Sequence, residues 1–423
     1  MTAGEPQTYA ARHFRWNFGV LQFEAVSFFI GLAFFDGGTV VPILMRRLGA
    51  DDMLIGLGRM VQVLGYTLPA LFAAHYIHGR RRHKPFLIAV CTVGRTGLLT
   101  IPIVLYLFGA ARPGFALAWM FVAIGLFWLL DGACAVSWFD IVAKAIHGRV
   151  RGRFFGMMQT LGGIGAVFAG FAVERILAPS GPSFPRNFAM LAAVWGVGAI
   201  VSQVGLMLLR EPEGLERAHN DRPGFVGYIG GALPLLRRRP QLLRIIVLRI
   251  ALDGAGMAGP FYALYAVSDL HQPVAILGLY ITIQSAGKIV TGPFWGWITD
   301  HLGPTVGVRC VAVAVLAAPA IALLSAHTGA WSLPIVFFLL GSTQEGAWMV
   351  TSNAILASVT EEERPLAVGV SSACQTPSAI YGVVGGLIAA AASYRMAFAA
   401  SAALAAMGAM LAFRMPRASD PPA

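Results

Sequence analysis

Charged residues are scarce in this sequence, and their scarcity excludes most soluble architectures. Asp, Glu, Lys and Arg together make up 12% of its 423 residues, whereas a soluble domain carries about 25%. Long apolar runs recur from Leu21 to Phe413, without strict alternation of apolar and polar residues. Because backbone in lipid is satisfied only in helices or closed barrels, these runs predict an all-α polytopic membrane protein.

Metal-ligand clusters and nucleotide-binding motifs are also missing from the sequence. No GxxxxGK[ST] motif is present, which argues against an ATP-driven pump. No Ser-His-Asp arrangement stands out, so we expect no enzymatic activity, no cofactor and no bound metal. The cysteines lack metal-binding spacing and are interpreted as small packing residues: Cys91, Cys134, Cys310 and Cys374.

The apolar runs are long enough to be membrane spans, each of which needs about 20 residues. The longest connection between them begins with a charged, proline-bounded stretch and divides the spans into six and six. We therefore expect an N-terminal six-helix bundle over 1–209, a cytoplasmic linker over 210–242 and a C-terminal six-helix bundle over 243–423. The twelve predicted spans are 20–45, 54–77, 86–109, 115–141, 153–177, 187–209, 243–267, 274–298, 306–326, 331–357, 366–391 and 394–414.

Basic residues outside the predicted spans gather on one side of the membrane. If the N-terminus is cytoplasmic, the cytoplasmic loops hold most of them, as the positive-inside rule requires. The run LRRRPQLLR before the seventh span is explained by topology and by contact with anionic lipid. The net charge of +11 therefore does not indicate nucleic acid. We expect a functional monomer in a bacterial inner membrane, with both termini cytoplasmic.

The two halves of the sequence look like weak repeats of each other. SWFDIVAKAIHGRVRGRFFG in the first half parallels VTSNAILASVTEEERPLAVG in the second. Within this pair of segments, Asp140 corresponds to Asn353 and Arg151 to Arg364. Two parallel six-helix repeats, with a binding site between them near the bilayer midplane, are a known transporter plan. The repeats therefore favour a transporter.

Four acid–glycine steps lie inside the apolar runs. An ionisable side chain near the middle of a span costs about 2.5 to 3.5 kcal/mol on insertion scales, so it is usually functional or paired. The glycine that follows each acid could let a helix bend or a substrate approach the backbone. Together they indicate an acidic transport pathway: Asp36-Gly37, Asp131-Gly132, Asp253-Gly254 and Glu345-Gly346.

With these features, the chain resembles the major facilitator superfamily over nearly its whole length. The family's signature, roughly Gly-x-x-x-Asp-Arg-x-Gly-Arg-Arg, is similar to GWITDHLG at 296–303, where His301 replaces the arginine. The first-half counterpart, AHYIHGRRRHKP, has His78 about where the acid is expected. The resemblance implies two pseudo-symmetric six-helix bundles that rock around a central site.

The resemblance also implies a charge network that holds the cytoplasmic side of the carrier closed when it faces outward. Asp300 is the better-supported member of this network, and Arg151 and Arg364 match basic positions that could pair with it. The predicted cytoplasmic gate consists of Asp300, Gly296, Gly303, Arg80, Arg81, Arg151 and Arg364.

The intramembrane acids have two interpretations, a proton or cation site and structural pairing. Asp131 and Glu345 have no basic neighbour in sequence, which makes them the preferred proton carriers. Arg249 and Asp253 are four residues apart and could neutralise each other. Two further pairs are possible, between Asp36 and Arg59 and between Glu24 and Arg95.

Aromatic and polar groups beside the acids could line a substrate cavity, and aromatics next to acids suit organic cations. We expect proton-coupled transport of a small organic solute, with efflux of cationic or drug-like compounds preferred. The alternative is uptake of a sugar or other metabolite by proton symport, and a different class would be a lipid-translocating or non-transporting sensor member. The predicted cavity residues are Trp128, Trp348, Gln284, Gln344, Asn353, Lys288 and Arg95.

Overall fold

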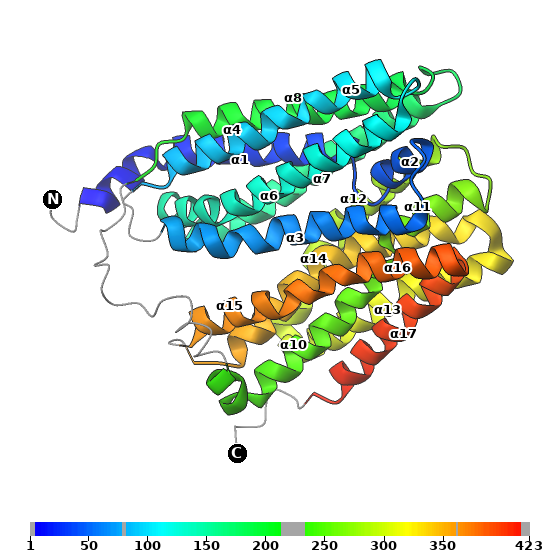
Figure 1. Ribbon diagram of the computed structural model, residues 1–423. Helices are drawn as coiled ribbons and strands as arrows, with labels where there is room; N and C mark the ends of the chain where they lie inside the picture. The colour runs from blue at the N-terminus through cyan, green and yellow to red at the C-terminus, as the bar shows by residue number, and fades with distance from the viewer. Residues whose placement is uncertain (1–4, 78–81, 213–232, 361–362, 416–423) are drawn as a thin grey trace. The chain divides into compact units, whose positions relative to one another are not determined.

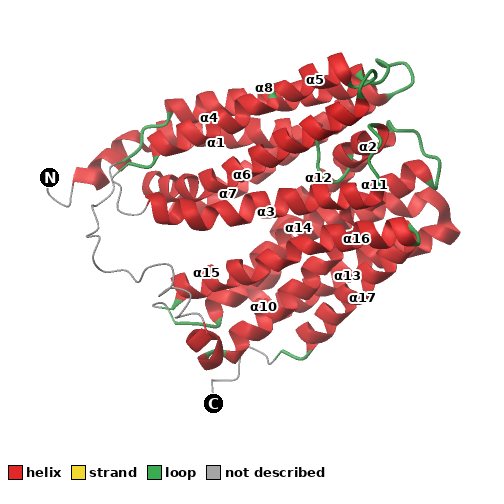
Figure 2. Cartoon of the chain, in the orientation of Figure 1, coloured by secondary structure: helices red, strands yellow, loops and turns green. Residues whose placement is uncertain are grey.

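A computed structural model describes residues 5–77, 82–212, 233–360 and 363–415. These residues form helices joined by short turns, and no strand occurs among them (Figure 2). The helices follow the apolar runs of the sequence, which confirms the predicted all-α class. The helices of the first half are α1 (Glu5–Phe34), α2 (Val40–Arg47), α3 (Asp52–Ile77), α4 (Lys84–Leu98), α5 (Thr100–Phe108), α6 (Pro113–Ala145), α7 (Gly148–Leu177) and α8 (Arg186–Leu208).

The second half repeats this plan with more interruptions (Figure 1). Three short 3-10 segments connect or divide its helices. Residues 233–238 are also helical. In chain order the elements are α10 (Pro240–Asp253), η2 (Gly254–Ala258), α11 (Gly259–Ser268), α12 (Ile276–Leu302), α13 (Pro304–Thr328), η3 (Gly329–Ser332), α14 (Leu333–Ala357), α15 (Arg364–Gln375), η4 (Thr376–Ala379), α16 (Ile380–Ala391) and α17 (Tyr394–Phe413).

Eight segments of the described chain are long and apolar enough to cross a membrane. One of them, Pro304–Ala357, contains both α13 and α14. The remaining predicted spans fall on α3, on α12 and on α10 followed by α11. Charged side chains interrupt α3 and α12, and η2 separates α10 from α11. The helices therefore fit the predicted polytopic membrane protein.

Contacts between backbone atoms divide the chain into two compact units. Unit 1 comprises Met1–Asp36, Arg47–Gly49 and Val61–Asp221, and unit 2 comprises Gly37–Arg46, Ala50–Met60 and Arg222–Ala423. The helix α3 contributes its first turns to unit 2 and the rest to unit 1. The division into an N-terminal bundle, a linker and a C-terminal bundle, expected from the sequence, stays a prediction.

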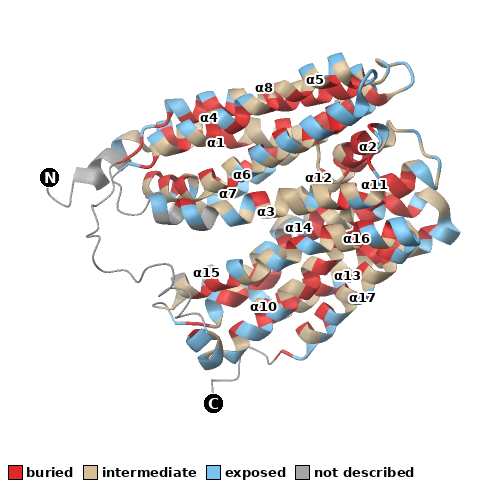
Figure 3. Ribbon diagram, in the orientation of Figure 1, coloured by how far each residue is buried: buried red, intermediate tan, exposed pale blue. Residues whose placement is uncertain are grey.

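Each unit has its own apolar core, drawn as the buried positions of Figure 3. In unit 1, Leu21, Ile141 and Phe154 belong to a cluster formed by α1, α4, α6, α7 and α8. In unit 2, Leu248 and Val350 belong to a second cluster. Many large apolar side chains remain exposed in the described residues, as expected of a protein in contact with lipid.

Two of the acid–glycine steps mark breaks in helices. The helix α1 ends at Phe34, and α2 begins only at Val40, so Asp36 lies in the break. The helix α10 ends at Asp253, where the backbone continues as the 3-10 turn η2. The predicted bend is therefore present at both steps. The other two steps lie inside the uninterrupted helices α6 and α14.

One end of unit 1 is fixed by reciprocal capping of two helices. The Glu211 carboxylate accepts hydrogen bonds from the backbone N–H groups of His83 (2.7 Å) and Lys84 (2.9 Å) at the start of α4. In return, the Lys84 ammonium donates to the carbonyls of Met207 (2.8 Å) and Leu209 (2.6 Å) at the end of α8. Each charge opposes the partial charge of the other helix's end, so both ends are satisfied.

Candidate functional site

The helix α6 presents a polar and aromatic face in unit 1. Trp128, Asp131 and Trp138 are spaced at helical intervals, so they share one side of α6. The helix packs against α4 and α1. The predicted cavity residue Trp128 contacts Tyr66 of α3 edge to face, with ring centroids 6.2 Å apart.

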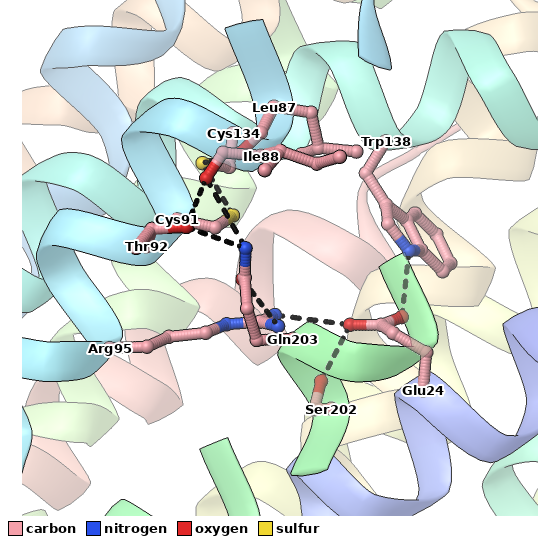
Figure 4. Close-up of polar contacts among 10 residues, drawn as sticks. All are labelled: Glu24, Leu87, Ile88, Cys91, Thr92, Arg95, Cys134, Trp138, Ser202 and Gln203. Atoms are coloured by element: carbon pink, nitrogen blue, oxygen red, sulfur yellow. Dashed lines mark hydrogen bonds and ion pairs between the residues drawn. The ribbon is translucent and has the colours of Figure 1, made fainter. Parts of the chain in front are cut away.

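Next to this face lies a buried ion pair that connects α1 and α4. The Arg95 guanidinium donates to the Glu24 carboxylate at 3.1 Å, and both residues are 4% exposed. Two more donors complete the coordination of Glu24, the Ser202 hydroxyl at 2.8 Å and the Trp138 indole at 2.9 Å (Figure 4). The predicted Glu24–Arg95 pair is therefore confirmed, and it includes α6 and α8 as well.

Gln203 extends the same network along α4. Its side-chain carbonyl accepts from Arg95 at 3.2 Å, and its amide donates to the Thr92 hydroxyl at 2.8 Å and the Ile88 carbonyl at 3.2 Å (Figure 4). The Arg95 guanidinium also lies over the Phe28 ring, 5.5 Å from its centroid. Arg95 was predicted to line a substrate cavity. In the structure the hydrogen bonds occupy the two terminal nitrogens of its guanidinium, and a direct role in substrate binding stays a prediction.

Asp131 has a different environment from Glu24. Its carboxylate is close enough to Arg95 and Glu24 for their charges to act on it. No hydrogen bond or ion pair joins Asp131 to another residue of the described part of the chain. The Arg95 guanidinium thus pairs with Glu24, while its charge also acts on Asp131, which has no such donor of its own among the described residues. With both acids ionised, this cluster carries one excess negative charge.

The glycine after Asp131 allows another helix to approach closely. A Cβ at Gly132 would lie 2.7 Å from the Tyr66 carbonyl carbon and 2.8 Å from the Gly65 carbonyl oxygen of α3. Such distances leave no room for a side chain. The absence of a side chain at Gly132 is therefore explained by packing of α3 against α6, rather than by the approach of a substrate considered from the sequence.

A second charged group surrounds the break between α10 and η2 in unit 2. Asp253 accepts a hydrogen bond from the Ser378 hydroxyl at 3.3 Å, and Ser378 lies in the break η4. The positive charges of Arg249 and Arg59 act on the Asp253 carboxylate. Arg249 donates to the Thr351 hydroxyl at 2.6 Å. Arg249 and Asp253 therefore do not hydrogen-bond each other. The Arg249 charge still acts on the Asp253 carboxylate, while each side chain hydrogen-bonds a residue of another helical segment.

The other predicted cavity residues lie on α12 and α14 of unit 2. Trp348 is 57% exposed, and Lys288 has no hydrogen bond or ion pair with another described residue. The Glu345 side chain lies outside the described residues. A Cβ at the neighbouring Gly346 would lie 2.6 Å from the Trp295 indole nitrogen, so this glycine allows α12 to pack on α14. The predicted roles of Gln284, Gln344 and Asn353 stay predictions.

The predicted gate residues are only partly described. Asp300 is exposed near the end of α12, and Gly303 ends that helix at φ +85°, a conformation that favours glycine. Arg151 donates to the carbonyls of Ala143 (3.0 Å) and Ile146 (3.3 Å) at the end of α6. Gly296 has open space beside it. Arg80, Arg81 and the Arg364 side chain lie outside the described residues, so the gate remains a prediction.

Sequence reasoning missed several polar contacts. Ser202 and Gln203 complete the Glu24–Arg95 network, and their signal was the presence of polar residues in the apolar helix α8. In unit 2, Arg46 binds Asp52, and the Tyr394 hydroxyl lies 3.0 Å from Arg46 and 3.1 Å from Asp52. Tyr394 is far from Arg46 and Asp52 in sequence, and no local pattern indicated its contact with them.

Comparison with known proteins relates both sequence and fold to transporters. Residues 246–423 match the family model described as Major Facilitator Superfamily. No curated protein sequence matches this chain. Among solved structures, the nucleoside transporter NupG aligns with a TM-score of 0.70 at 15% identity, covering 93% of this chain and 98% of that one.

Two further structures have the same fold. The D-xylose-proton symporter aligns with a TM-score of 0.70 at 13% identity, covering 96% of this chain and 99% of that one. A bacterial homologue of the iron transporter ferroportin, in an inward-facing state, aligns with a TM-score of 0.67 at 13% identity, covering 94% and 98%. At these identities the likeness establishes the fold.

Proposed function

Because residues 246–423 match the family model described as Major Facilitator Superfamily and the chain has the fold of solved transporters, we propose that it is a member of that superfamily and a proton-coupled secondary transporter of a small organic solute. We assign the proton to Asp131. The observation that carries this proposal is the unequal environment of two acids beside one guanidinium. Glu24 accepts hydrogen bonds from Arg95, Ser202 and Trp138, whereas Asp131 has no such donor among the described residues.

Hydrogen bonds to an ionised carboxylate favour the charged form, and burial without them favours the neutral form. We assign Glu24 as the permanent partner of Arg95. Asp131 is the group that takes up and releases a proton. Each cycle changes the charge of the cluster between zero and one excess negative charge. A charge change of this kind can drive alternating access only if the two conformations differ in their affinity for the proton.

Efflux of a cationic compound follows from competition for the same carboxylate. An ionised Asp131 attracts a cation, and Trp128 on the same face of α6 offers an aromatic surface for a cation–π contact. A protonated Asp131 loses this attraction. Proton and cation therefore exclude each other, which gives exchange of a proton for a cation. We also propose a monomer in a bacterial inner membrane, with both termini cytoplasmic; the distribution of basic residues in the loops supports the orientation.

The second candidate is proton-coupled uptake of a sugar or other metabolite. The fold likeness to a D-xylose-proton symporter supports this alternative. Symport requires that proton and solute bind together, so it predicts co-movement of both. The two candidates therefore differ in the direction of proton movement: protons move against the solute in antiport and with it in symport.

Reconstituted protein in liposomes that contain a pH-sensitive dye distinguishes these functions. External ethidium should drive protons out of the liposomes under antiport, whereas external D-xylose or uridine should bring protons in under symport. Asp131→Asn should abolish the proton signal, and the exposed-site variant Glu174→Gln on α7 should retain it. Solute flux that is indifferent to an imposed pH gradient would contradict proton coupling. Absence of flux for every solute, with lipid movement instead, would favour the lipid-translocating class.

A further inference from the structure

Two cysteines face each other across the contact between α4 and α6 in unit 1. The Cys91 and Cys134 sulfur atoms are 2.7 Å apart, and the residues are 4% and 3% exposed. The Cys134 sulfur also contacts the Leu87 carbonyl oxygen at 3.8 Å (Figure 4). A disulfide bond has sulfur atoms about 2.05 Å apart. Closing the remaining distance requires a shift of only about 0.7 Å.

The position of this thiol pair relates it to the charged cluster. Cys91 lies one helical turn before Arg95 on α4, and Cys134 lies one turn after Asp131 on α6. Figure 4 shows both sulfurs beside the network that joins Arg95 to Gln203. Packing accounts for two small buried residues. Packing alone does not require that both residues be cysteines with their sulfur atoms 2.7 Å apart.

We propose that Cys91 and Cys134 form a reversible dithiol–disulfide site whose oxidant is a peroxide. One thiol gives up its proton as its sulfur attacks a peroxide oxygen, the O–O bond breaks, and the leaving hydroxide takes up that proton, so that a sulfenic acid and water form. The second thiol then displaces the sulfenic hydroxyl as water, and the S–S bond forms. In total, two S–H bonds are lost, hydrogen peroxide gains two electrons and two protons, and two water molecules leave. A dithiol reductant restores both thiols by thiol–disulfide exchange and is itself oxidised to a disulfide.

Oxidation joins α4 to α6 at a point one turn away from both Arg95 and Asp131. The crosslink fixes the separation of the helices that carry these groups, and reduction releases it. This site exists regardless of which solute the protein carries or whether a proton is coupled. Its test therefore needs no transport measurement.

The experiment uses the full-length protein with Cys310→Ser and Cys374→Ser, so that only the pair remains. Samples treated with hydrogen peroxide are denatured and alkylated with a maleimide-polyethylene glycol reagent that shifts the band on a gel. We expect two alkylated thiols per chain before oxidation, none after it, and two again after dithiothreitol. Peptide mass spectrometry should find the Cys91 and Cys134 peptides crosslinked in one chain.

A further readout tests the constraint on the helices. Amide hydrogen exchange in α4 and α6 should slow after oxidation and recover after reduction. A variant that also carries Cys91→Ser serves as the matched control and should show neither the crosslinked peptide nor the slowed exchange. Two thiols that remain free after peroxide treatment would overturn the proposal. Irreversible oxidation or a crosslink between two chains would overturn it as well.

Discussion

The Arg95 guanidinium lies 3.1 Å from the Glu24 carboxylate, and both groups are buried in the interior of unit 1. The Ser202 hydroxyl and the Trp138 indole occupy further acceptor sites of Glu24. Four helices thus meet at one carboxylate, which makes the pair a structural element as well as a neighbour of the proposed proton site.

Removal of one member of this pair should destabilise the protein strongly. Glu24→Gln leaves the Arg95 charge buried without its partner, and breaking a buried pair costs about 3–5 kcal/mol. Thermal unfolding in detergent measures the loss. The double variant Glu24→Gln with Arg95→Gln should recover part of it, because no uncompensated charge remains. A single variant as stable as the wild type would show that the pair contributes nothing.

Asp131→Asn should behave in the opposite way. Because Asp131 has no hydrogen-bond partner among the described residues, its replacement by the neutral amide should leave the unfolding temperature near that of the wild type. Proton-coupled flux in liposomes should be lost. If Asp131→Asn retained full coupling, the proton would have to be assigned to another acid. Glu174→Gln, at an exposed position of α7, controls for removal of a carboxylate elsewhere.

Gly132→Ala should loosen the contact between α3 and α6. The added methyl group would lie 2.7 Å from the Tyr66 carbonyl carbon, and overpacking costs about 1–3 kcal/mol. The matched control is Gly97→Ala in α4, where no atom lies within 4 Å. Because alanine favours a helix by about 1 kcal/mol over glycine, this control should be neutral or stabilising. Equal unfolding temperatures for both variants would contradict the packing role of Gly132.

Glu211→Ala should weaken the junction between α4 and α8. The substitution removes two hydrogen bonds to the first turn of α4, and loss of a helix cap costs about 0.5–2 kcal/mol. Hydrogen exchange should increase in the first turn of α4 and remain unchanged at its other end. The control Glu174→Gln removes a carboxylate without touching a helix start. Unchanged exchange near Lys84 in the Glu211 variant would argue against the cap.

The ion pair of Glu363 with Arg239 should make stability depend on pH in the acidic range. The Thr360 backbone N–H and the Arg239 guanidinium, which lies 3.0 Å from the carboxylate, lower the pKa of Glu363. A carboxyl group with a lowered folded pKa contributes stability above its unfolded pKa, about 4.3. This contribution is lost as the pH falls through the folded pKa.

Comparison of the wild type with Glu363→Gln isolates that contribution. The variant should unfold at a lower temperature than the wild type at pH 7, and the difference should close as the pH falls through the folded pKa of Glu363. A difference that persisted unchanged at the acidic end would have to arise from something other than the charge of Glu363. The Arg239→Gln variant should reproduce part of the effect at pH 7.

The sequence predicted the helices well because apolar runs are a local property. Each of the twelve predicted spans coincides with one helix or with two or three consecutive helical segments. The interruptions were harder to locate. The division of α15 from α16 at η4 includes the contact of Ser378 with Asp253, and that contact joins residues distant in the chain.

The candidate site was predictable only in part for a similar reason. The Glu24–Arg95 pair could be proposed because few charges are available inside the spans to neutralise each other. The contributions of Ser202, Trp138 and Gln203 depend on the rotation of each helix about its axis, which tertiary packing sets. The spacing of Arg249 and Asp253 indicated a shared face, yet their hydrogen bonds go to Thr351 and Ser378 on other helices.

The break at Asp36 and the break at Asp253 occupy corresponding places in the two halves of the chain. If the halves descend from a single duplicated gene, the interruption was already present in the ancestral six-helix protein before fusion. That ancestor would have had to assemble as a pair of identical copies to form a complete carrier.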